Sequence, residues 1–73
     1  MAHQIELFST VALTQDLPAI GLVRGQVGTV VELLPPDAFE VEFSDDNGRT
    51  YASLGLKNDQ FMVLHHAPVK ATT

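Results

Sequence analysis

One stretch decides the fold: FEVEFSDDNG, residues 39–48. Its three apolar residues alternate with Glu40 and Glu42, the period-two pattern of a strand with one face in a core and the other in water. The stretch ends in Asn-Gly, the dipeptide that best accepts the positive φ angles of a tight hairpin turn. We therefore expect a strand whose glutamates face outward, then a hairpin, then a new strand that begins at Arg49.

The segments on either side of this hairpin also have the character of strands. Residues 50–56 continue the alternation, and the β-branched segment 27–34 is stopped by Pro35-Pro36-Asp37. The apolar residues between Glu6 and Thr14 predict a first strand that ends at a proline-containing turn. Each segment has the length typical of a strand in a small β-protein.

The remaining segments predict the connections. Two glycines within residues 19–26 disfavour a helix and indicate a long, ordered loop whose apolar residues pack under the sheet. The polar residues 57–60 predict a single helical turn before a short last strand at 61–64. Five strands in about sixty residues is the spacing of a small barrel. The fold class expected is all-β: a small five-stranded SH3-like barrel with a long first loop and a short helical turn before the last strand.

The chain has 73 residues, enough for one thin core. We expect one barrel domain at residues 1–64 and a flexible C-terminal tail at residues 65–73, which lack periodicity. The side chains expected in the core include all four phenylalanines: Phe8, Phe39, Phe43 and Phe61.

Composition excludes several classes of protein. Cysteine is absent, which removes disulfides, thiolate zinc sites and cysteine nucleophiles. The formal net charge of −5 has the wrong sign for holding phosphate backbones, so nucleic acid is a disfavoured partner. No basic leader precedes an apolar run and no apolar segment approaches the roughly 20 residues that span a bilayer. A soluble, cytoplasmic protein without a membrane partner is expected.

Neither a metal site nor a catalytic site is expected. Of the three histidines, His3 is near the N-terminus, while His65 and His66 are adjacent and would point in opposite directions on an extended chain. No serine lies in a Gly-x-Ser-x-Gly elbow, and the strand carboxylates are expected in water rather than paired in a cleft. The glycines match neither a phosphate loop nor a dinucleotide turn, so no cofactor is expected. The prediction is a protein that is not an enzyme.

The residues left for binding are charged or aromatic and are expected at the surface. Tyr51 is the only tyrosine and tryptophan is absent, which disfavours the aromatic groove that binds polyproline. An acidic strand face suits a basic partner through electrostatic steering. The candidate binding residues are Asp16, Arg24, Glu32, Glu40, Glu42, Arg49 and Tyr51.

The chain also resembles known small barrels. A glycine-punctuated turn entering a valine-rich strand, residues 25–30, is similar to the opening of KOW-type and related SH3-like barrels. A closer resemblance is to a family of short, uncharacterised bacterial proteins known as a domain of unknown function, some of whose members are encoded beside putative toxins. The segments that carry it are VALT (11–14), DLP (16–18), GL (21–22), RG (24–25), VGTVVE (27–32), EVEF (40–43) and KNDQ (57–60). The resemblance implies a fold and supplies no catalytic residues.

Three functions remain open. The first is a non-enzymatic module that binds another protein through its acidic face and first loop, with antitoxin-like or immunity-like neutralisation of a basic partner as a specific version. The second is nucleic-acid binding in the KOW or Sm manner through Arg24, Arg49 and Lys57. The third is a homo-oligomeric assembly unit that pairs through an open edge strand.

Overall fold

A computed structural model describes residues 5–68 of the chain. His3 and the end of the expected tail, residues 69–73, lie outside the described residues. The described part contains five strands and one short 3-10 helix. They are β1 (Thr10–Leu13), η1 (Pro18–Ile20), β2 (Val27–Leu34), β3 (Ala38–Ser44), β4 (Thr50–Lys57) and β5 (Phe61–Val63).

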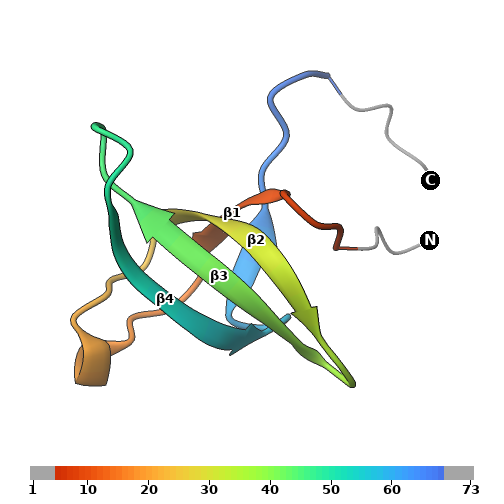
Figure 1. Cartoon of the computed structure of the whole chain (residues 1–73), viewed down its shortest axis with the longest axis horizontal. Helices are drawn as coiled ribbons and strands as arrows, with labels where there is room; N and C mark the ends of the chain where they lie inside the picture. The colour runs from red at the N-terminus through yellow and green to blue at the C-terminus, as the bar shows by residue number, and fades with distance from the viewer. Residues whose placement is uncertain (1–4, 69–73) are drawn as a thin grey trace.

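The strands form one antiparallel sheet in the order β4-β3-β2-β1-β5. The last strand therefore pairs with the first, and β4 and β5 are the two edges of an open sheet. Figure 1 shows β2, β3 and β4 as a strongly twisted ribbon, with the loop that carries η1 standing out beyond it. The expected all-β fold with five strands and a long first loop is confirmed.

The core lies on the inner face of the sheet. Val41 and Phe43 are fully buried, as their alternation with the glutamates predicts, and Phe61 is also buried. Phe39 is partly buried and meets the Phe61 ring edge-on, with ring centroids 5.7 Å apart. Every strand contributes at least one of the buried apolar residues, which are Val11, Ala12, Leu13, Leu22, Val30, Val41, Phe43, Leu56 and Phe61.

The prediction that the first strand begins near Glu6 is wrong. β1 begins only at Thr10, and Leu7 and Phe8 lie in a turn before it. Phe8 is 73% exposed and has a φ of 68°, so it is not a core residue. Its backbone is fixed instead by the Phe8 N–H, which donates to the carbonyl of Val30 at 2.6 Å. The turn itself is closed by the Ser9 N–H, which donates to the Glu6 carbonyl at 3.1 Å, and the aromatic ring is left in solvent.

The turns also differ in detail from expectation. In the β3–β4 hairpin only Gly48 has a positive φ, 79°, because its N–H closes a four-residue turn on the Asp45 carbonyl at 2.9 Å, after which one left-handed residue returns the chain to β4. Asp45 Oδ1 also accepts hydrogen bonds from the backbone N–H groups of Asn47 and Arg49. Before β5, the chain makes one hydrogen-bonded turn, in which the Gln60 N–H donates to the Lys57 carbonyl at 3.0 Å. The 3-10 helix of the described chain lies in the first loop instead.

Candidate functional site

An acidic row crosses the outer face of the sheet. In the register, Glu32 of β2 lies directly opposite Glu40 of β3, and Glu42 is two residues further along β3. Carboxylates directly opposite one another on neighbouring strands repel each other and destabilise the sheet by a fraction of a kcal/mol. Three of the predicted binding residues are therefore brought together on one surface.

Glu40 is oriented toward the free edge of the sheet. Its Oε2 accepts a hydrogen bond from the Ser53 hydroxyl of β4 at 2.7 Å. Its Oε1 lies 4.0 Å from the point where a Cβ would stand on Gly55, the residue opposite it on β4. Since Gly55 has no side chain, the outer face ends at this row in an open position, where the nearest side-chain atoms are Leu34 Cδ1 at 3.4 Å and this carboxylate oxygen.

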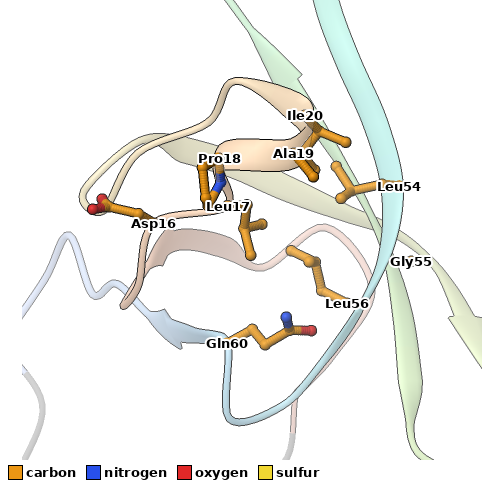
Figure 2. Close-up of a pocket in the computed structure, with 9 residues that line it drawn as sticks. All are labelled: Asp16, Leu17, Pro18, Ala19, Ile20, Leu54, Gly55, Leu56 and Gln60. Carbon is orange, nitrogen blue, oxygen red and sulfur yellow. The ribbon is translucent and has the colours of Figure 1, made fainter.

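Beside this edge lies an open apolar groove of about 340 Å³, at the small end of the roughly 300–1,000 Å³ typical of ligand pockets. Figure 2 shows η1 above the groove, β4 along one side and Gln60 at the other end, with the side chains of Leu17 and Leu56 pointing toward each other across it. Ile20, on η1, is about half exposed. The lining residues are Asp16, Leu17, Pro18, Ala19, Ile20, Leu54, Gly55, Leu56 and Gln60.

The wall of the groove opposite β4 is a closed loop. The backbone groups of Leu17 and Leu22 bond to each other in both directions, at 2.8 and 3.2 Å, and η1 fills the bend between them. Gly21 ends η1 with a φ of 74°, a conformation that a side chain would strain. The apolar residues of η1 are thus fixed in position although η1 buries none of them.

Gly55 lines the groove with backbone atoms alone, and their direction follows from the ladder. Lys57 turns both of its backbone groups away from β3, because its N–H donates to Gln60 Oε1 at 2.9 Å and its carbonyl accepts from the Gln60 N–H. In an antiparallel pair this orientation recurs at every second residue. Gly55 therefore presents its N–H and carbonyl to the free edge of β4, next to the groove.

The inner strands give the same result independently. Val30 uses its N–H and its carbonyl to bond Ser9 and Phe8, so it turns both groups away from β3. Its partner Val41 must then turn toward β4 and engage Leu54. Gly55, the next residue, faces outward.

Three other predicted residues, Asp16, Arg24 and Tyr51, form a second group, defined by their contacts with the first loop. The Arg24 N–H donates to Asp16 Oδ1 at 2.9 Å, so this carboxylate braces the loop. Tyr51 is 48% exposed, its hydroxyl accepts a hydrogen bond from Gln26 Nε2 at 3.0 Å, and its ring lies 6.4 Å from that of Phe43. These contacts give the group a structural role at the surface.

The three basic residues Arg24, Arg49 and Lys57 lie on different parts of the structure. Arg49 is in the β3–β4 hairpin and Lys57 is at the far end of β4, so the length of that strand, roughly 25 Å, separates them. Arg24 is on a third element, the first loop. The described chain thus lacks a single basic surface formed by these three residues.

For metals, residues 5–68 contain no group of three or more His, Asp or Glu side chains arranged to hold an ion. His65 and His66 are exposed and lie beyond β5. Within the same residues, no helix has the length and apolar character needed to cross a bilayer.

Comparison with models of known protein families assigns the chain to a family. The model of DUF4926, a domain of unknown function, matches residues 7–63. The chain belongs to the DUF4926 family. The DUF4926 match runs from the turn before β1 to the end of β5 and so includes the acidic row and the groove. Searches of curated proteins and of solved structures found no significant match.

The groove of this DUF4926 domain was missed by the sequence analysis. Leu54 and Leu56 were expected in a strand, and the apolar residues of 19–26 were expected to pack under the sheet, but nothing in the local pattern indicates that the loop meets these two leucines at an open groove. One signal was available, since LPAI is an apolar run inside a loop. An apolar run in a loop indicates a surface that contacts another segment or a partner.

Proposed function

We propose that this domain is a non-enzymatic interaction module that binds a basic protein partner. The observation that carries the proposal is the outward row in which Glu32 faces Glu40 across two strands, beside an apolar groove. The repulsion within this row is relieved when a cation of a partner lies over it, so binding and relief of strain would coincide. The separation of the basic residues favours a protein partner over nucleic acid.

The finer parts of this proposal have other support. An SH3-like barrel agrees with the pairing of the first and last strands. Neutralisation of a basic toxin-like partner in the cytoplasm rests on the gene neighbours of the bacterial family that the sequence resembles. The absence of catalysis rests on carboxylates that lie along a strand face rather than paired in a cleft.

The test is affinity capture from a lysate of the source cells at low and at high salt. The first variant is Glu40→Lys with Glu42→Lys, and the matched control is Asp37→Lys with Asp46→Lys, which changes the net charge equally in two turns. We expect a basic protein to be retained at low salt by the wild type and the control and lost from the first variant. Equal retention by both variants, or no salt-sensitive partner, would contradict the proposal.

A further inference from the structure

The free edge of β4 and the groove beside it form one continuous surface. Gly55 presents an N–H and a carbonyl there, and β4 pairs with β3 alone among the described strands. An edge strand with unpaired backbone groups is a template for another strand. Peptide recognition by strand addition uses such an edge for affinity and adjoining pockets for alternate side chains.

We propose that an extended segment of the partner adds to the edge of β4 at Gly55, and that apolar residues alternate with Lys or Arg in this segment. The inference rests on the proposed function and names its binding site. The occupant is a segment of another protein, and its chemistry follows from the two faces of the added strand.

The inner face of the added strand requires apolar side chains. Successive side chains of a strand point to opposite faces, so every second residue of the added segment would point into the groove. There it meets Leu17, Leu54 and Leu56. Polar side chains that face these leucines would lose water without gaining a partner from them.

The outer face requires cations. A residue opposite Gly55 continues the row that contains Glu32 and Glu40, and neighbouring strands lie about 4.8 Å apart. The Gly55 position holds no side chain, and the point where its Cβ would stand is 3.4 Å from Leu34 Cδ1 and 4.0 Å from Glu40 Oε1. A Lys or Arg on the added strand would reach this carboxylate across the gap, whereas an acidic residue would extend a row that is already repulsive.

Charge also argues against a second copy of the chain as the occupant. Two copies paired through β4 would bring two outer faces with Glu40 and Glu42 to one edge, and each chain has a net charge of −5. A basic segment of a different protein satisfies the same edge without this repulsion.

The test uses the full chain and three synthetic hexapeptides with blocked ends: Lys-Val repeated three times, Glu-Val repeated three times, and the block peptide of three lysines followed by three valines. Binding is measured by calorimetry and by amide chemical shifts. We expect the alternating basic peptide to bind about tenfold or more tightly than the block peptide, and the acidic peptide not to bind. Shifts should occur in β4 and in residues 16–20.

The protein variants separate main-chain pairing from charge. Gly55→Pro removes the outward N–H, which an edge strand tolerates, while Gly55→Ala keeps it and adds a methyl group in ordinary contact with Leu34. We expect Gly55→Pro to weaken the alternating peptide about tenfold relative to Gly55→Ala. Should the proline variant not fold, methylation of alternate peptide nitrogens in the probe tests main-chain pairing with wild-type protein, because it removes the donors to the Gly55 carbonyl.

The outcomes distinguish the two proposals. If the alternating and block peptides bind equally and both depend on Glu40 and Glu42, the basic partner stands and strand addition is wrong. If the acidic peptide binds as well as the basic one, both proposals are wrong. A wild-type dimer by sedimentation that Gly55→Pro dissociates would show that the occupant is a second copy, and no binding of any peptide would also overturn the inference.

Discussion

Gly28 is the position where the structure leaves no room for a side chain. It is buried in β2 and pairs on one side with Val11 of β1 and on the other with Phe43 of β3. An ideal Cβ on Gly28 would lie 2.8 Å from Val41 Cγ1, 2.9 Å from the Glu42 carbonyl oxygen and 3.0 Å from Phe43 Cδ2. One of these atoms belongs to the backbone, so a rotamer change alone does not relieve the overlap. We predict that Gly28→Ala destabilises the domain.

The magnitude follows from two opposing effects. Overpacking a buried site costs roughly 1–3 kcal/mol, and replacing glycine with alanine recovers about 0.4–1 kcal/mol by restricting the unfolded chain. The net loss for Gly28→Ala is then roughly 1–2 kcal/mol in the free energy of unfolding. The matched control, Gly55→Ala, meets nothing closer than Leu34 Cδ1 at 3.4 Å, and we expect it to be neutral or stabilising.

Urea unfolding followed by far-UV circular dichroism is the suitable assay, because the chain has no tryptophan. A loss of 1 kcal/mol lowers the melting temperature of a domain of this size by roughly 4–8 °C, which is readily measured. The slope of the free energy against urea should stay constant, which shows that the two folded states are equally compact. Equal midpoints for Gly28→Ala and Gly55→Ala would refute the steric argument.

Three other substitutions test features of the surface. Phe8→Gly should raise the free energy of unfolding by about 1 kcal/mol, since a φ of 68° is costly for a residue with a side chain; a fall in thermal stability would mean that the ring packs. Glu32→Thr should raise it by roughly 0.2–1 kcal/mol by removing the repulsion with Glu40, and a gain that did not shrink with added salt would contradict that cause. Asp45→Ala should lower the free energy of unfolding, measured by chemical denaturation, by about 1–2 kcal/mol because it removes two side-chain hydrogen bonds; an equal loss in Asp46→Ala would show that these bonds are not the cause.

The strands that follow a strict local pattern could be predicted from the sequence. The alternation around Val41 gave the inner and outer faces of β3, and the proline pair gave the end of β2. The start of β1 could not be predicted in this way, because Phe8 is apolar and lies next to a strand. Phe8 is removed from the strand by its positive φ of 68°, in a turn that the Ser9 N–H closes on the Glu6 carbonyl, and the local pattern indicates neither.

The acidic row shows a second limit. Glu32 and Val30 are two residues apart, so in a regular strand both would face the core. The register shifts between them, with Val30 opposite Val41 but Glu32 opposite Glu40, and this irregularity moves Glu32 to the outer face. Because the segment is apolar almost throughout, its sequence does not indicate where the extra residue lies. The outward direction of Glu40 and Glu42 could be predicted from the alternation, but the register that places Glu32 opposite Glu40 could not.

The free edge of β4 and the acidic row would act on the same added strand. A free edge invites pairing with any extended chain, and proteins commonly limit this with charge placed near the edge. Here the charge is one strand inward, on Glu40, and it extends over a residue that has no side chain. In the proposed strand addition, an acidic or neutral strand would gain only main-chain hydrogen bonds at Gly55, whereas a basic one would also offset the repulsion between Glu32 and Glu40. Under the proposed strand addition, the same row that disfavours self-pairing would therefore select the chemistry of the partner.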